Sequence, residues 1–152
     1  ENLQVEAKLI NQTLKEEKEK LEKIRNNTQG YYVVEVKRKL AEIMNEHMGI
    51  IRNDSSLREG SNKLDQLIKE VETKGIIYQE NDYDIYSITN MLMVGKVMLK
   101  CALERKESRG AHAREDYPEL NDAQYLKTTV ARYHSERGIQ IVFEPLNNNF
   151  KG

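Results

Sequence analysis

Apolar side chains recur at helical spacing along most of this chain, and this periodicity constrains the fold more than any other feature. From Asn2 to about Arg25, leucine and isoleucine return every three to four positions, with lysine and glutamate between them. A second stripe occupies residues 33–48 and ends at Gly49. Each pattern predicts an amphipathic helix, and the two helices are long enough to lie antiparallel as a helical hairpin.

Two further helices are expected before the periodicity stops. Ser56 and Glu59 have the spacing of a capping box, so a third helix should open there and end near Gly75. Residues 76–86 are rich in tyrosine, aspartate and asparagine, and we expect them to wrap over the bundle. Across residues 87–104, apolar side chains cover most of the helix circumference. That helix is predicted to be central, buried on nearly all sides, with its methionines as core.

The pattern changes after Arg105. Residues 106–121 are polar, with Gly110 and Pro118 as punctuation, which is typical of a loop. Two apolar, β-branched runs follow at 125–133 and 139–143, separated by about five mostly polar residues, and they predict a β-hairpin. Because two strands alone are marginally stable in water, this hairpin should lean on the bundle or on a partner.

These segments together predict a mostly α fold, a three- to four-helix bundle of up-and-down helices like those of spectrin repeats, with a short C-terminal β-hairpin. A length of 152 residues suits a single domain. We divide it into a helical bundle (1–105), a motif loop (106–121) and a hairpin with C-terminal extension (122–152). The chain opens at Glu1 inside an expected helix, which suggests a segment of a larger protein.

Charge and cysteine content bear on partners and location. With 24 basic and 25 acidic residues the net charge is -1, so no overall field attracts nucleic acid or anionic lipid. No apolar stretch approaches the roughly 20 residues that a membrane span needs, and we expect no direct membrane insertion. The single cysteine, Cys101, lies in an apolar run, where it should behave as a small buried hydrophobe. A reducing, cytoplasmic setting fits these features.

The usual catalytic signatures are absent from the sequence. It contains no glycine-rich loop of the dinucleotide or phosphate-binding type, no paired cysteines or histidines at zinc spacing, and no nucleophile elbow. The histidines, His47, His112 and His134, are scattered, and each is expected to be a surface or hydrogen-bonded residue. We therefore predict no catalytic, cofactor-binding or metal-binding residue in this chain.

One segment, residues 105–118, is difficult to explain as scaffold alone, because it is polar although it follows the most apolar helix. A solvated loop is the simplest interpretation. Its spaced arginines, however, are suited to bind carboxylates and backbone carbonyls at an interface. The candidate residues are Arg105, Glu107, Ser108, Arg109, Gly110, His112, Arg114, Asp116 and Pro118.

The run Glu-Ser-Arg-Gly-Ala-His at 107–112 makes the interpretation specific. Followed by Arg114, Asp116 and Pro118, it resembles the signature that ends the helical domain in flavoprotein subunits of succinate dehydrogenase and fumarate reductase, shared in variant form by L-aspartate oxidase. Outside this run the resemblance is carried by residues 95–106, Asp122, residues 125–129, Met44, Gly49, Ile50 and Arg52. Thr128 stands where the family usually has histidine.

The resemblance implies an FAD-dependent parent enzyme that interconverts succinate and fumarate, with hydride passing between substrate and flavin. In such proteins the flavin-binding glycines and the catalytic arginine and histidines precede this domain. The chain would then be a C-terminal helical domain without catalysis of its own, packed on the FAD-binding domain of the same polypeptide. An iron–sulfur subunit would join the parent complex, and other subunits could attach it to the cytoplasmic face of a membrane.

Within this interpretation Arg109 is expected to reach outward to the neighbouring domain, because a long cationic side chain gains little from burial in its own bundle. Two alternatives stay open. The chain can be a free-standing helical module that binds another protein through its apolar helix or its hairpin edge, or the equivalent domain of L-aspartate oxidase.

Overall fold

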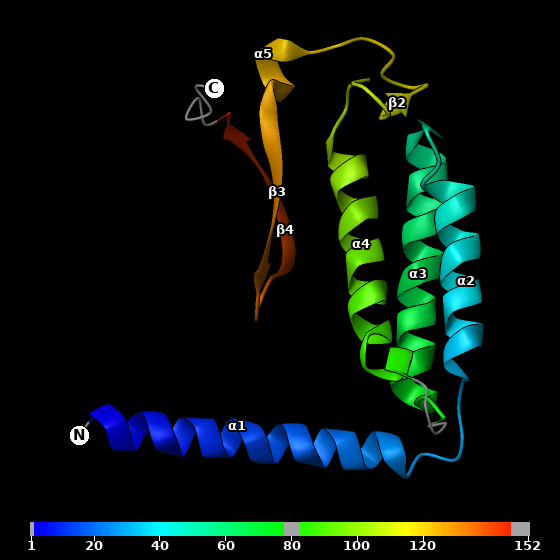
Figure 1. Ribbon diagram of the computed structural model, residues 1–152. Coiled ribbons are helices and arrows are strands. Elements are labelled where there is room, and N and C mark those ends of the chain that lie inside the picture. The colour runs from blue at the N-terminus through cyan, green and yellow to red at the C-terminus, as the bar shows by residue number, and fades with distance from the viewer. Residues whose placement is uncertain (1, 78–82, 147–152) are drawn as a thin grey trace.

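The computed structural model describes residues 2–77 and 83–146. Its helices are α1 (Asn2–Arg25), α2 (Val33–His47), α3 (Asp54–Lys74), α4 (Ile88–Glu104) and the short α5 (Asp122–Tyr125), with a 3-10 turn at Tyr83–Tyr86. Its strands are β1 (Ile51–Arg52), β2 (Ala113–Arg114), β3 (Lys127–His134) and β4 (Gly138–Pro145). The predicted mostly α class with a C-terminal hairpin is confirmed (Figure 1).

Helices α2, α3 and α4 lie side by side and enclose the core (Figure 1). The buried core side chains are Val33, Val36, Leu40, Leu57, Leu64, Leu67, Val71, Ile76, Ile85, Ile88, Leu92, Leu99 and Ala102. Gly95 lets α4 approach closely, because a Cβ there would lie 3.2 Å from side-chain carbons of both Leu40 and Leu64. Each fully buried leucine or isoleucine contributes about 1.5 to 3 kcal/mol, so this face sets the arrangement of the bundle.

Helix α1 does not pair with α2, and the predicted helical hairpin is wrong. Figure 1 shows α1 running away from the bundle, and Leu9, Ile10 and Leu14 are 64%, 59% and 54% exposed. The reason lies in the link after α1, which is tied to the end of α3. Asn27 Nδ2 donates to the Ile76 carbonyl at 2.9 Å, and the Tyr31 amide donates to the Gly75 carbonyl at 3.1 Å.

Gly30 makes this tie possible. Its φ of +121° lies in the region that favours glycine, and a Cβ there would sit 2.3 Å from the Gly75 carbonyl oxygen. The backbone therefore turns close against the end of α3, which directs α1 outward.

Helix α3 begins two residues before the predicted capping box. Asn53 is its N-cap and accepts a hydrogen bond from the Ser56 amide at 2.9 Å. The Ser56 hydroxyl is instead 3.0 Å from His47 Nδ1. The predicted end at Gly75 is confirmed, with φ +78° and its amide bonded to the Val71 carbonyl at 2.8 Å.

Helix α4 is buried on one face only, so the prediction of burial on nearly all sides is wrong. On the other side Met91, Met93, Val94 and Met98 are 40%, 45%, 57% and 44% exposed. Helices α2 and α3 cover one face of α4 and the C-terminal hairpin contacts it on another side, while α1 stands clear of it (Figure 1). An apolar strip is left open.

The C-terminal hairpin lies beside α4 (Figure 1). Strands β3 and β4 pair antiparallel from Lys127 with Pro145 to His134 with Gly138. The loop is therefore shorter than predicted, residues 135–137, and Gly138 closes it with φ +66°. The predicted connection at 76–86 lies partly outside the described residues, as does the end of the C-terminal extension.

None of the described helices combines the length and apolarity needed to cross a membrane.

Candidate functional site

The motif residues gather at the end of the bundle where α4 stops and β2 crosses the α2–α3 connection. Strand β2 pairs parallel with β1, matching Ala113 with Ile51 and Arg114 with Arg52. The Ala113 amide donates to the Ile50 carbonyl at 3.1 Å. This short ladder fixes the loop against a segment about 60 residues earlier in the chain.

The loop is also bonded to itself. Arg109 and His112 exchange backbone hydrogen bonds of 2.8 and 3.0 Å around a two-residue turn, in which Gly110 has φ +56°. The Ser108 hydroxyl accepts from the Arg114 amide at 2.8 Å and is 2.9 Å from the Tyr117 carbonyl, to which it can donate. Gly110 and Ser108 therefore shape the loop. Pro118 lies on its exposed part.

Glu107 is fully buried and is held by two arginines. Arg109 donates to its two oxygens at 2.9 and 3.1 Å, Arg105 forms an ion pair with it, and the Asn121 amide donates at 3.0 Å. Burial alone would raise the pKa of Glu107, but hydrogen bonds from Arg109, Asn121 and Arg105 outweigh it and lower that pKa to about 2. The carboxylate is therefore ionised and structural.

Arg109 does not reach outward, so the prediction for its side chain is wrong. Its guanidinium binds Glu107 and also Asp122 at the start of α5. A buried carboxylate requires a hydrogen-bonded cation, and this requirement outweighs the gain from solvation. The sequence contained both residues but not their contact.

Arg114 is buried beneath the loop and joins two helix ends. It binds Asp116 through two bonds of 2.7 Å and donates to the Ala102 carbonyl in the last turn of α4 at 2.8 Å. Asp116 in turn accepts from the Asp54 amide, at the start of α3, at 3.0 Å. Its bonds from Arg114 lower the pKa of Asp116 to about 2.

Arg105 attaches the hairpin to the bundle. Its guanidinium donates to the carbonyls of Tyr125 and Lys127 at 2.9 and 2.7 Å and to the Thr129 hydroxyl. It also lies over the rings of Tyr125 and Phe143, 5.7 and 5.4 Å from their centroids.

His112 is half-buried between two arginines. Its Nε2 lies 3.0 Å from the Arg105 carbonyl, which can only accept, so Nε2 carries the proton. Its Nδ1 is then an acceptor for Arg52 Nη1 at 2.6 Å. Burial and the charges of Arg52, Arg114 and Arg105 lower the pKa of His112, which favours this neutral form.

Arg52 was not among the predicted site residues, although it belonged to the resemblance. Its position three residues after Gly49, at a helix exit, was the available signal. Its Nε donates to the Gly49 carbonyl at 2.5 Å. Burial and the charge of Arg114 lower the pKa of Arg52.

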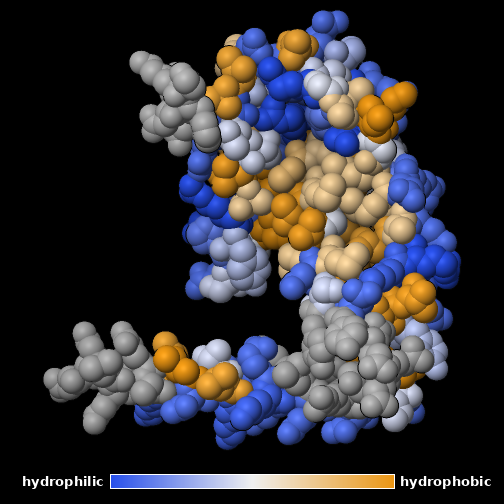
Figure 2. Space-filling view, viewed as in Figure 1, coloured by the Kyte–Doolittle hydropathy of each residue, from blue (hydrophilic) through white to orange (hydrophobic). Residues whose placement is uncertain are grey.

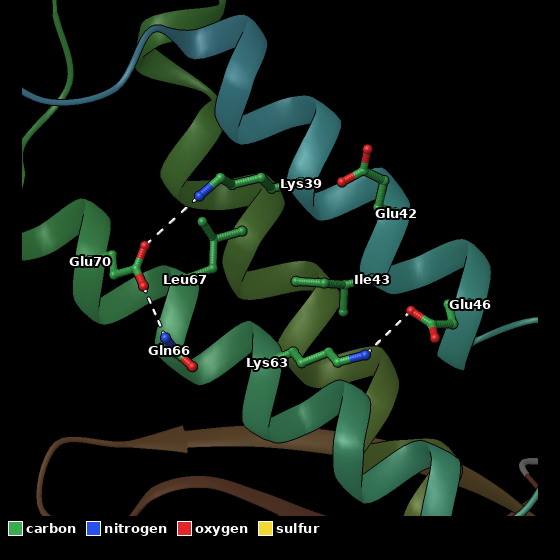
Figure 3. A pocket seen from close by; sticks show the side chains of 8 residues that line it. All are labelled: Lys39, Glu42, Ile43, Glu46, Lys63, Gln66, Leu67 and Glu70. Atoms are coloured by element: carbon green, nitrogen blue, oxygen red, sulfur yellow. Dashed lines mark hydrogen bonds and ion pairs between the residues drawn. The ribbon is translucent and has the colours of Figure 1, made fainter.

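Two surface pockets lie against the helices of the bundle. The first, between α2 and α3, has a volume of about 300 Å³ and a largely polar lining (Figure 3). Its charges are paired within the chain, Lys63 with Glu46 at 3.3 Å and Lys39 with Glu70 at 3.9 Å (Figure 3). Glu42 pairs with Arg38 at 2.7 Å, so each charged side chain that lines this pocket has a partner among the residues that the structure describes.

The second pocket, about 280 Å³, opens between α4 and β3 beside the motif loop. It is lined by Met48, Arg52, Val97, Met98, Cys101, Ala102, Arg105, His112 and Thr129. All five methionines of the chain lie on α4, on α2 or directly after α2: Met44, Met48, Met91, Met93 and Met98. We call the exposed apolar residues of α4, Met91, Met93, Val94 and Met98, the methionine face. Figure 2 shows an apolar hollow on this side of the molecule.

The described part of the chain is a three-helix bundle whose end is closed by an arginine-bonded loop and whose helix α4 leaves apolar side chains exposed. Residues 37–151 match the family model described as fumarate reductase flavoprotein C-term, so the chain belongs to that family.

Known relatives agree with this assignment. The succinate dehydrogenase flavoprotein subunit of Bacillus subtilis is 31% identical over 136 residues, 85% of this chain and 23% of the relative. The subunit from Rickettsia felis is 28% identical over 132 residues, 84% of this chain and 22% of the relative. A solved chain of Escherichia coli quinol fumarate reductase has a TM-score of 0.75 at 24% identity, covering 90% of this chain and 25% of its own. The chain thus spans less than a quarter of these curated relatives.

Proposed function

We propose that this chain is the C-terminal docking domain of an FAD-dependent flavoprotein that interconverts succinate and fumarate. It packs on the FAD-binding domain of the same polypeptide and carries no reacting group itself. The observation that carries the proposal is the methionine face, an open apolar strip beside an internally bonded loop. Exposed apolar surface of this kind marks an interaction site in soluble proteins, and thioethers adapt well to a partner's shape.

The motif loop supports docking indirectly. Its charged side chains Glu107, Arg109 and Arg114 are satisfied within the chain, so they hold the loop in one shape. The exposed turn at Gly110 and Ala111 can then contact the neighbouring domain. Because the loop is already ordered, binding costs it little conformational entropy. In the assembled parent, an iron–sulfur subunit accepts electrons from the flavin, and other subunits hold the complex at the cytoplasmic face of the membrane.

The direct test compares the isolated residues 1–152 with the polypeptide as encoded. Absorbance of bound flavin and fumarate-dependent oxidation of a reduced viologen dye are measured on both. We expect FAD and activity in the encoded polypeptide and neither in residues 1–152. Stoichiometric flavin on residues 1–152 alone, or an encoded polypeptide without flavin, would contradict the proposal.

A substitution pair tests the methionine face itself. Met91→Glu places a charge in the apolar strip, outside the pocket that Arg52 lines, and should speed FAD loss from the encoded polypeptide, because docking would then bury an unpaired carboxylate. Met91→Leu keeps an apolar side chain of similar volume and should retain FAD normally. Equal retention by the two variants would remove α4 from the interface.

A further inference from the structure

Arg52 differs from the other arginines at this end of the bundle. Arg105, Arg109 and Arg114 each form an ion pair with a carboxylate of the chain. Arg52 has no carboxylate within ion-pair distance among residues 2–77 and 83–146, and its Nη2 makes no hydrogen bond within them. Its neighbours are a neutral imidazole and a second arginine.

The positive charge of Arg52 has no counter-charge among the described residues. Its side chain is partly buried, and the nearby charge of Arg114 opposes its own. A partly desolvated cation without a counter-charge is unfavourable, while a paired one gains strong charge-assisted hydrogen bonds. An anion from outside the described residues would supply the missing counter-charge.

The guanidinium is already oriented for that anion. The Gly49 carbonyl binds Nε and His112 binds Nη1, so Nη2 is left for a ligand. Because these two bonds already fix the Arg52 side chain, it loses little rotamer freedom when a ligand binds. Arg52 lines the pocket of about 280 Å³ between α4 and β3, together with Met48, Met98 and Cys101. An entering group meets apolar walls and one oriented cation.

We propose that Arg52 is the charged anchor of the docking surface and binds an aspartate or glutamate side chain of the docked flavin-binding domain. The inference rests on the proposed function. A protein carboxylate fits better than a free anion because Met98 belongs both to the pocket and to the methionine face. A single apolar protein segment that bears a carboxylate can cover the methionine face and also place its carboxylate in the pocket. A small anion would fill the pocket but leave the methionine face exposed.

The experiment uses the encoded polypeptide carrying Arg52→Lys, treated with a carbodiimide that joins amines to contacting carboxylates. Peptide mass spectrometry should find residue 52 linked to an acidic residue outside residues 1–152. Arg38→Lys is the matched control, because Arg38 pairs with Glu42 at 2.7 Å on the surface of α2 and should link to Glu42. A link from residue 52 only to acidic residues of 1–152, or no link while the control reacts, overturns the inference.

Arg52→Gln provides an independent measurement. FAD should dissociate roughly ten- to a hundredfold faster, the loss expected when one side of a charge-assisted hydrogen bond is removed. Arg38→Gln should leave the rate unchanged. Unchanged FAD retention in Arg52→Gln would overturn the inference while the proposed function stands. If the encoded polypeptide holds no flavin, the proposed function fails, and the mass of the cross-linked peptide still decides whether residue 52 contacts a protein carboxylate.

Discussion

At the scale of single residues, this domain buries ionised groups and, with the exception of Arg52, pairs those at the motif loop with opposite charges. Glu107 has no exposed side-chain surface and is bonded by Arg105 and Arg109, and Arg114 is held by Asp116 and by carbonyls of α4. Such pairs add little net stability, but removing one partner is strongly destabilising because it leaves the other charge uncompensated.

Glu107→Gln should therefore destabilise the chain by at least about 3 kcal/mol, the range for breaking a buried ion pair from one side. The substitution keeps the side-chain shape, leaves the guanidinium of Arg105 without its charge partner and leaves Arg109 with Asp122 alone. Urea unfolding followed by circular dichroism measures the change. Glu42→Gln, which breaks only the exposed pair with Arg38, should stay within about 0.5 kcal/mol. Equal effects of the two substitutions would show that burial of Glu107 does not matter.

Acid should weaken the fold in two stages. His112 has a pKa below its usual 6.5, so the unfolded chain binds the proton more readily, and stability falls once pH drops below about 6.5. The pKa values of Glu107 and Asp116 are lowered from 4.5 and 3.8 to about 2, so their contribution is present above those unfolded values and is lost as pH falls towards 2. Thermal melts between pH 7 and pH 3 measure both stages, and Glu107→Gln should flatten the second. A melting temperature independent of pH would contradict this assignment.

The sequence predicts most members of this site but not the contacts between them. It identified the arginines, Glu107 and Asp116 through the motif, since their order along the chain is visible. It missed Arg52 and placed Arg109 outward, because Arg52–His112 and Arg109–Asp122 are contacts between separate segments. Spacing within one loop carries no information about which residues face it from another helix.

At the scale of elements, helical periodicity predicted where the helices lie but not what covers them. The apolar circumference of α4 predicts a buried core helix. In the structure one face of α4 packs in the bundle, another side contacts the hairpin, and the methionine face is exposed. The apolar stripe of α1 likewise predicts a contact with α2, but the link between the two helices directs α1 away from the bundle (Figure 1). Helical periodicity predicts that one face of a helix is apolar. It does not predict which segment covers that face, and this segment can belong to another chain or domain.

The direction of α1 depends on one backbone position. Gly30→Ala should destabilise the link between α1 and α2 by about 1 to 3 kcal/mol, because φ +121° disfavours a side chain and the added Cβ would meet the Gly75 carbonyl at 2.3 Å. Gly49→Ala is the control, since its nearest atom would be 3.8 Å away and its φ lies outside the glycine-favouring range. Thermal unfolding measures both. Comparable melting temperatures would indicate that the link tolerates a different path.

At the scale of the whole molecule, the structure has an open outline. The hairpin lies beside α4 on one side and α1 extends on another, with an apolar hollow between them (Figure 2). The sequence alone predicted the family through its motif and the fold class through its periodicity. The open outline could not be predicted, because sequence patterns do not show which apolar surface stays exposed after the helices have packed. The division into bundle, motif loop and hairpin stays a prediction.

The methionine face has a chemical consequence. Peroxide converts a thioether to a polar sulfoxide, which disfavours burial and disrupts methionine-rich interfaces. Met91, Met93 and Met98 are open in this chain, whereas Met44 and Met48 pack partly against the core. The exposed three should therefore oxidise first in residues 1–152 and be protected in the encoded polypeptide, as peptide mass spectrometry after brief peroxide treatment would show. Uniform oxidation of all five in both forms would contradict this. If the methionine face docks as proposed, oxidation of its thioethers before docking would weaken the contact, whereas oxidation after docking would be slow.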